Sequence, residues 1–176
     1  TNAPYGLAKK NLLIGCQAFA NQYGSNFIHL IPVNMYGEHD HFSLENSHVI
    51  PAMLRKFHEA KETQASSVTL WGDGSASREF LYAGDCAEAI WKAFRAYDKP
   101  DPINIKELAT IIQRLTKFKG KITWDTTKPN GQPRRCLDTT KAKEAFDFES
   151  KTTLEEGIQK TYDWYLENIE SIDEDE

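Results

Sequence analysis

The segment Phe27–Val33, with the sequence FIHLIPV, is the feature that most narrows the fold of this chain. It is a nearly continuous apolar run, without the strict alternation of a strand that has one face in water. Such runs are typical of strands that are buried on both faces in a parallel sheet. Residues 1–22, directly before it, have a helical pattern. Together these two segments predict an α/β fold.

Helical and strand patterns alternate along the rest of the chain. In the first helix Asn2 suits the N-cap, and apolar side chains such as Leu12 and Leu13 lie on two sides, so both sides need to be covered. Further helices are expected at 47–61 (capped by Ser47), at 86–97 (capped by Asp85), at 106–117, after Asp138, and from a Thr153–Glu156 capping box. Strands are expected at 68–71, 78–82, 102–104 and 121–124, loops at 34–37, 39–47 and 128–135, and a disordered tail at 172–176.

Composition indicates the broad class of protein. The chain has 176 residues, 40% of them hydrophobic and 27% charged, and is expected to form one domain with its own core. Its net charge of -5 and the lack of a basic stripe argue against a nucleic-acid partner. No apolar run approaches ~20 residues, so we expect no membrane span. The three scattered cysteines favour reduced thiols in the cytoplasm over disulfides or a metal site.

Tyr5 and Lys9 are the residues that most directly suggest chemistry. Their spacing places a phenol and an ammonium on the same face of the first helix. A neighbouring cation favours the phenolate, which makes a phenol a better proton donor and acceptor. Reduction of a ketone by hydride needs such a group. By spacing alone, however, an interfacial tyrosine beside a solvated lysine is the favoured interpretation.

Three further segments extend this pattern: His39–Met53 (HDHFSLENSHVIPAM), Trp71–Phe80 (WGDGSASREF) and Lys128–Arg134 (KPNGQPR). With the Tyr5 and Lys9 pair in front, they resemble the GDP-L-fucose synthases, a family of extended short-chain dehydrogenase/reductases, over nearly the whole chain. The resemblance implies a partial Rossmann-type, doubly wound sheet with a small C-terminal substrate-binding lobe. Residues 1–45 and 85–104 would form the sheet side and the remainder the lobe.

The resemblance also implies a reaction. Family members use NADPH to epimerise C3 and C5 and to reduce C4 of GDP-4-keto-6-deoxy-D-mannose, and a homodimer built on the first helix is expected. By motif match, Tyr5 gives a proton to the C4 oxygen, Lys9 holds the nicotinamide ribose, and His48 returns protons and touches the cofactor. Pro32, Val33, Asn34 and Met35 would line the nicotinamide, and Lys56, Trp71, Arg78, Asn130 and Arg135 would contact the GDP-sugar.

Some parts of the family pattern have no counterpart in these 176 residues. They are the glycine-rich dinucleotide loop, the serine of the catalytic triad and the cysteine that serves as epimerisation base. The junction at Asn104–Ile105 is also shorter than a usual loop between strand and helix, which suggests a deletion, a fragment, or a chain with disordered parts left out. We therefore interpret the chain as the C-terminal portion of such an enzyme, inactive and weak in NADPH binding by itself.

Other readings stay open. The chain could be another nucleotide-sugar epimerase or dehydratase, or a non-catalytic module for sugar-nucleotide binding or dimerisation. Trp71 could pack in the core, Lys56 could be an exposed surface lysine, and Arg78 could pair with Glu79. Local roles are expected for the remaining candidates: hydrogen bonds for His29 and His58, solvated loop positions for His39 and His41, and core packing for Trp91, Phe94, Trp164 and Tyr165.

Overall fold

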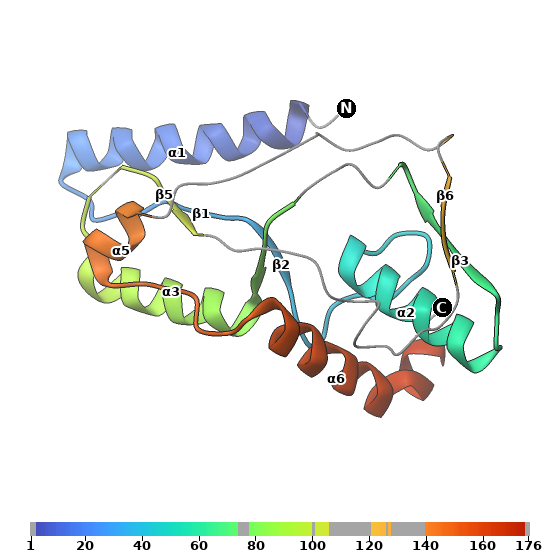
Figure 1. Cartoon of the computed structure of the whole chain (residues 1–176). Coiled ribbons are helices and arrows are strands. Elements are labelled where there is room, and N and C mark those ends of the chain that lie inside the picture. The colour runs from blue at the N-terminus through green and yellow to red at the C-terminus, as the bar shows by residue number, and fades with distance from the viewer. Residues whose placement is uncertain are drawn as a thin grey trace.

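The computed structural model describes residues 3–73, 78–99, 101–105, 121–125, 127 and 140–174. Helices and strands alternate along this part of the chain (Figure 1). In chain order the elements are α1 (Ala3–Tyr23), β1 (Leu30–Pro32), β2 (Asn34–Tyr36), α2 (Val49–Glu62), β3 (Ser67–Trp71), β4 (Phe80–Tyr82), α3 (Ala83–Ala96), β5 (Ile103–Ile105), β6 (Lys121–Asp125), α5 (Thr140–Phe146) and α6 (Leu154–Glu174).

The strands form three parallel pairs, β1 with β5, β2 with β4, and β3 with β6. Leu30 lies opposite Ile103, and Asn34 lies opposite Phe80. Each pair joins segments that are distant in sequence and are connected through at least one helix, which is the pattern of an α/β fold. The predicted α/β class with parallel strands is therefore confirmed.

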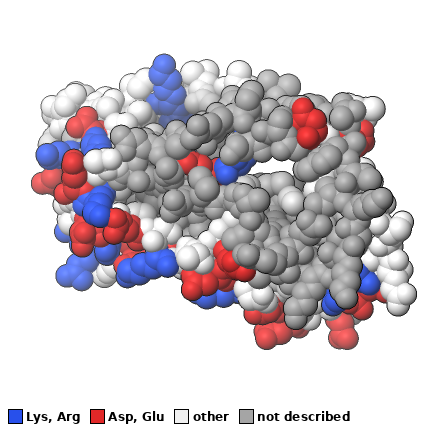
Figure 2. All heavy atoms as spheres, in the orientation of Figure 1, with Lys and Arg blue, Asp and Glu red and all other residues white. Residues whose placement is uncertain are grey.

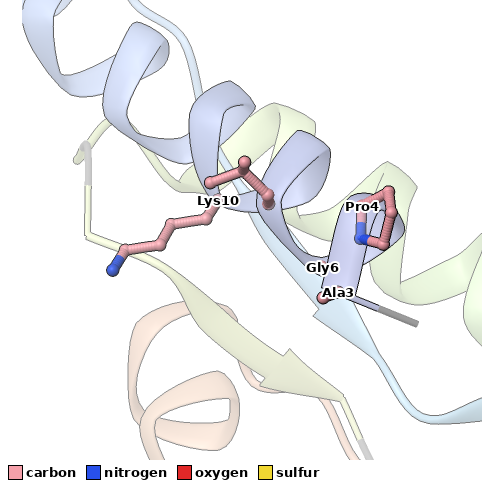
Figure 3. Close-up of a pocket in the computed structure, with 5 residues that line it drawn as sticks. Ala3, Pro4, Gly6 and Lys10 are labelled. Atoms are coloured by element: carbon pink, nitrogen blue, oxygen red, sulfur yellow. The ribbon is translucent and has the colours of Figure 1, made fainter. Parts of the chain in front are cut away.

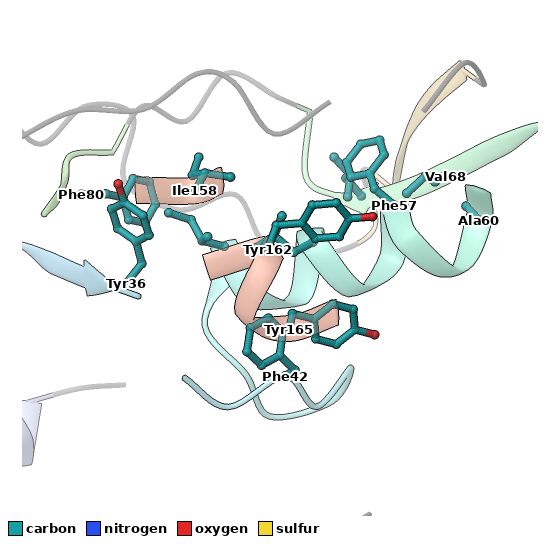
Figure 4. Packing of buried hydrophobic residues seen from close by; sticks show 12 residues of the cluster. Tyr36, Phe42, Phe57, Ala60, Val68, Phe80, Ile158, Tyr162 and Tyr165 are labelled. Carbon is teal, nitrogen blue, oxygen red and sulfur yellow. The ribbon is translucent and has the colours of Figure 1, made fainter. Parts of the chain in front are cut away.

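A first hydrophobic core joins α2, β3, β4 and α6 around Tyr36 (Figure 4). In α2 the buried side chains Ile50, Leu54 and Phe57 recur at helical spacing, so one face of the helix enters this core. Tyr165, from α6, is 1% exposed. Its predicted place in the core is confirmed, and Trp164 packs against the same cluster.

A second core lies between α3, α5 and the β1 segment. Its buried members include Cys86, Ala89 and Ala93 of α3 together with Phe146 of α5, and Leu30 and Val33 pack against them. Small residues at the α3 positions allow the helix to approach closely. The predicted division into a sheet side (1–45 and 85–104) and a lobe stays a prediction.

Helix α1 departs from the expectation that both of its sides are covered. None of its residues is buried, and Leu12 and Phe19 are each more than half exposed. Figure 1 shows α1 at one edge of the molecule, alongside β1 and β5. Trp91 and Phe94 of α3, predicted as core residues, are also exposed, at 57% and 73%. Those two predictions were wrong, because helical spacing identifies an apolar face but not what covers it.

Element boundaries differ from the predictions in several places. The strand expected at Phe27–Val33 is limited to Leu30–Pro32, and part of the expected loop after it is strand β2. The cap of α2 is His48 rather than Ser47, and no side chain hydrogen-bonds the cap. Helix α3 begins at Ala83, so Asp85 lies within its first turn instead of capping it. Helix α6 reaches Glu174, so the expected tail is helical over 172–174.

The Thr153–Glu156 capping box is confirmed. The Thr153 backbone N–H donates to Glu156 Oε2 at 2.9 Å, and the Glu156 N–H donates to Thr153 Oγ1 at 3.2 Å. Both partners lie within four residues of each other, so the sequence contains everything that this motif needs. The predicted helix at 106–117, the loop at 128–135 and the cap at Asp138 lie outside the described residues.

Candidate functional site

The Tyr5 and Lys9 side chains lie on one face of α1, as their spacing predicted. Lys9 Nζ is 5.3 Å from the centroid of the Tyr5 ring, which is a cation–π contact. The Tyr5 side chain is 67% exposed. Phenol and ammonium are thus held together on an open surface, where a carbonyl oxygen and a ribose could reach them.

A hollow of about 620 Å³ borders another face of the same helix (Figure 3). Its lining consists of Ala3, Pro4, Gly6, Leu7 and Lys10. Neither member of the Tyr5 and Lys9 pair contributes to it. This hollow is therefore separate from the candidate proton donor.

The four residues expected to line a nicotinamide lie where β1 ends and β2 begins. Pro32 is the last residue of β1, while Asn34 and Met35 open β2, and all three are exposed. Val33, between the strands, packs against the second core instead. In open parallel sheets, ligands bind beyond the carboxyl ends of strands, and this segment occupies that position for β1.

His48 directly precedes α2 and has an extended backbone, with φ -69° and ψ 165°. Its side chain is 83% exposed. The ring Nδ1 lies 3.5 Å from Asp40 Oδ1, at ion-pair distance. The imidazole is therefore open to a ligand on one side and faces a carboxylate on the other.

Lys56 and Trp71 lie close together on the lobe. Lys56 Nζ is 5.8 Å from the Trp71 ring centroid, and it also donates to the Thr69 carbonyl at 3.5 Å. Trp71 is 60% exposed, so core packing is excluded for it. A cation beside a flat, open indole suits a ligand that has both an anionic group and a ring. Arg78 is half-buried just before β4.

The structure thus forms three local groupings from the predicted residues: Tyr5 with Lys9, Lys56 with Trp71, and His48 with an unpredicted aspartate. No hydrogen bond, ion pair or ring contact joins Tyr5 or Lys9 to His48 within the described ranges. Asn130 and Arg135, the remaining expected substrate contacts, lie outside those ranges.

Sequence reasoning missed the role of Asp85. Its carboxylate accepts hydrogen bonds from Ser150 Oγ at 2.6 Å, Thr152 N at 2.8 Å, Thr152 Oγ1 at 2.8 Å and Lys151 N at 2.9 Å. Burial by itself would raise the pKa of Asp85, but these hydrogen bonds outweigh it and lower the pKa below its usual value. Asp85 thus ties the first turn of α3 to the segment before α6.

A half-buried polar pair, Tyr82 and Glu38, lies near Asp85. The Tyr82 hydroxyl is 2.8 and 2.9 Å from the two carboxylate oxygens of Glu38. Burial, followed by the hydrogen bond to Glu38, raises the pKa of Tyr82 to about 12. Tyr82 and Tyr36 help to line a pocket of about 210 Å³ together with Phe80, Ser150 and residues 152–154. Because its phenol is held neutral, Tyr82 is a poor acid–base catalyst near pH 7.

The histidines outside the site have structural roles. His58 Nδ1 is 3.0 Å from the Tyr162 hydroxyl, which confirms a local hydrogen bond. The His39 ring lies 4.7 Å from Trp164 of α6, and the residue is exposed, as predicted for a solvated loop position. No cluster of potential metal ligands occurs among the residues that the structure describes.

Surface charges are mixed in sign on the face shown in Figure 2. Acidic and basic side chains alternate around α3 and α5, where Lys151 and Lys92 both approach Glu88 and Lys143 pairs with Glu149. Within the described ranges, no helix is both long enough and apolar enough to cross a membrane.

Fold and site together define a class of protein: an α/β chain with parallel strand pairs and an exposed Tyr5–Lys9 pair on its first helix. Residues 1–105 match the sequence profile of the NAD dependent epimerase/dehydratase family, and the chain belongs to this family.

Within the family, the similarity is to GDP-L-fucose synthases. The chain is 41% identical to GDP-L-fucose synthase 1 of Arabidopsis thaliana, over 96% of this chain and 54% of the relative. It is 36% identical to the GDP-L-fucose synthase of Escherichia coli K12, over 96% and 57%. A GDP-L-fucose synthetase from Naegleria fowleri bound to NADP superposes with a TM-score of 0.86 at 28% identity, covering 97% of this chain and 58% of that one. The chain thus spans about half the length of the curated relatives that it matches.

Proposed function

We propose that this chain supplies the proton-transfer and substrate-binding half of a GDP-L-fucose synthase. The reaction would be epimerisation at C3 and C5 and reduction at C4 of GDP-4-keto-6-deoxy-D-mannose. The observation that carries the proposal is the Lys9 ammonium 5.3 Å from the Tyr5 ring on an exposed helix face. The relatives' names supply the product, GDP-L-fucose, and the 41% identity extends over 96% of the chain.

The residues present fit a nicotinamide cofactor. Lys9 would hold the nicotinamide ribose. The exposed Pro32, Asn34 and Met35 would border the nicotinamide ring at the end of β1. Val33, between them, packs against the second core and would fix this segment. NADPH supplies a hydride when bound. The contribution of this chain is then a proton: Tyr5 would give one to the C4 oxygen, because an alkoxide formed there needs neutralising.

His48 would serve the epimerisation. An exposed imidazole can return a proton to a sugar carbon, and Lys56 and Trp71 would hold the nucleotide portion of the substrate. Arg78 would contact the diphosphate, with Asn130 and Arg135 as further contacts. A homodimer formed through α1 is part of the proposal, since the exposed Leu12 and Phe19 need a cover. The free thiols Cys16 and Cys86 fit a reducing compartment such as the cytoplasm.

The first prediction tests Tyr5. Tyr5→Phe should lower NADPH oxidation with GDP-4-keto-6-deoxy-D-mannose by about 10²- to 10⁴-fold, because the C4 oxygen loses its proton donor. Deuterium uptake from solvent at C3 and C5 should continue. The measurement uses the chain and, where its gene encodes a longer polypeptide, that polypeptide.

Tyr23→Phe is the matched control, since Tyr23 lies on the same helix and is 66% exposed. It should leave the rate unchanged. If the full-length polypeptide that contains this chain oxidises no NADPH with this sugar, or yields a product inverted only at C4 or dehydrated, the proposal is wrong and another epimerase or dehydratase activity takes its place.

A further inference from the structure

The contact between His48 and Asp40 carries an inference about how the imidazole is oriented. Asp40 Oδ1 lies 3.5 Å from His48 Nδ1, and the Asp40 side chain is only 16% exposed while that of His48 is 83% exposed. The carboxylate therefore lies on the protein side of the ring. Most of the His48 ring is exposed and can be reached by a ligand.

Asp40 itself is fixed by the backbone around it. Its Oδ1 also accepts the His41 N–H at 2.8 Å. The preceding residue, His39, has a left-handed backbone with φ 63°, and its ring packs 4.7 Å from Trp164 of α6. A non-glycine residue in this region needs such outside support. The contact between His39 and α6 thus holds the backbone directly before Asp40 in place.

The backbone that follows Asp40 is also held in place. Phe42 is 1% exposed, and its ring stacks 4.7 Å from Tyr165. The Phe42 carbonyl accepts a hydrogen bond from Arg55 Nη1 at 3.5 Å, and Arg55 Nε donates to Glu59 at 2.7 Å. Asp40 is therefore flanked by two aromatic anchors on α6, and it approaches His48 at the start of α2 as part of a rigid segment.

We propose that Asp40 is a positioning residue for His48. It holds the proton of the neutral imidazole on Nδ1, so that Nε2 presents its lone pair, or its proton when the ring is charged, to the ligand. The hydrogen bond made by one ring nitrogen determines the state of the other. At 3.5 Å the two atoms are at ion-pair distance, and a carboxylate this near favours a proton on the ring nitrogen that faces it.

This inference rests on the proposed function for its purpose, because an oriented imidazole matters only if His48 moves protons. The orientation of the His48 ring by Asp40 does not depend on the substrate, however. The tautomer of His48 can be measured in the unliganded chain.

The test is long-range ¹H–¹⁵N NMR of the histidine side chains, at a pH where the imidazoles are neutral. His48 should be mainly the Nδ1–H tautomer, whereas free histidine prefers Nε2–H. Asp40→Ala should move His48 to mainly Nε2–H. Glu45→Ala, a loss of an exposed carboxylate in the same loop, is the matched control and should change nothing. A wild-type His48 that is mainly Nε2–H, or an Asp40→Ala tautomer equal to the wild type, would overturn the proposal.

The wild-type spectrum decides the question even if Asp40→Ala fails to fold. Asp40→Asn gives a second check, since its amide oxygen can still accept from both His41 N and His48 Nδ1, and it should retain much of the Nδ1–H form. In the active protein, Asp40→Ala should slow deuterium exchange at C3 and C5 by about tenfold or more and leave the KM for the sugar within about twofold. A wild-type protein with the Nδ1–H tautomer but no exchange would refute the proposed function and leave the orientation by Asp40 standing.

Discussion

At the scale of single residues, the sequence showed which side chains are polar or charged but did not always show which residues they contact. The sequence identified Asp85 as a polar residue at a helix start, which was right, but assigned it to the cap. Its partners are Ser150, Lys151 and Thr152, more than 60 positions further along the chain. No local pattern contains that information. Tyr5 and Lys9, in contrast, were correctly placed together because one turn of helix separates them.

Substituting Asp85 should destabilise the fold in a pH-dependent way. The folded state lowers the pKa of Asp85, so its contribution is present above the pKa of the unfolded chain, ~3.9, and is lost as the pH falls further. Asp85→Asn should therefore reduce the free energy of unfolding by about 2 kcal/mol at pH 7, with a difference from wild type that narrows below pH ~4. Urea unfolding at several pH values measures this.

Asp98→Asn is the control, because Asp98 is exposed, and its effect should stay within about 0.5 kcal/mol. An Asp85→Asn deficit of equal size at pH 7 and pH 3 would show that packing, rather than the charged carboxylate, accounts for the loss.

At the scale of elements, short-range signals were predicted well and boundaries poorly. The capping box of α6 is local and was found. Strand β1 is shorter than its apolar run because strand length depends on the partner, and β5 pairs with only three of its residues, from Leu30 to Pro32. Equally, no sequence signal showed that the Asn34–Tyr36 segment would become a strand, since its partner β4 lies far along the chain.

The contact between α6 and β2 makes Gly157 a sensitive position. A Cβ there would overlap the Tyr36 hydroxyl and lie 2.9 Å from Tyr36 Cζ, in a ring that is 3% exposed. Gly157→Ala should lower the free energy of unfolding by about 1–3 kcal/mol. This loss should exceed the gain of about 1 kcal/mol that alanine brings to a helix interior. Thermal or urea unfolding measures the change.

Gly15→Ala in α1 is the matched control, since nothing lies within 4 Å of its added Cβ. It should leave stability unchanged or raise it by up to ~1 kcal/mol. Adding Tyr36→Phe to Gly157→Ala removes the overlapping hydroxyl and should recover part of the loss. Equal effects of alanine at Gly157 and Gly15 would rule out the steric explanation.

At the scale of the whole molecule, the parallel α/β class followed from the alternation of helical and strand patterns. The sequence did not show which apolar helix faces other parts of the molecule would cover. The exposed apolar side chains gather on α1 and on the Trp91–Phe94 face of α3. An amphipathic sequence shows which positions avoid water, and it shows nothing about whether the covering surface belongs to the same 176 residues. That is why Trp91 and Phe94 were wrongly assigned to the core.

The open face of α1 should cause self-association. Leu12 is 58% exposed, and burying such a side chain stabilises a contact by about 1.5–3 kcal/mol. Leu12→Glu should therefore raise the dimer dissociation constant by about tenfold or more, as measured by light scattering over a concentration series. Asn11→Glu adds the same charge at the adjacent, exposed polar position and should have little effect. A wild-type chain that stays monomeric at its highest soluble concentration would contradict a dimer built on α1.

The parallel pairing of strands also has a kinetic consequence. Leu30 pairs with Ile103, and Ser67 with Lys121, so the ends of long chain segments must meet before either ladder exists. Closing such segments costs entropy before any ladder hydrogen bond compensates for it. We therefore expect the sheet pairs to form late and slowly during folding, after α2 and α6. While they are still open, the unpaired strand edges are the part of this molecule most exposed to misassembly.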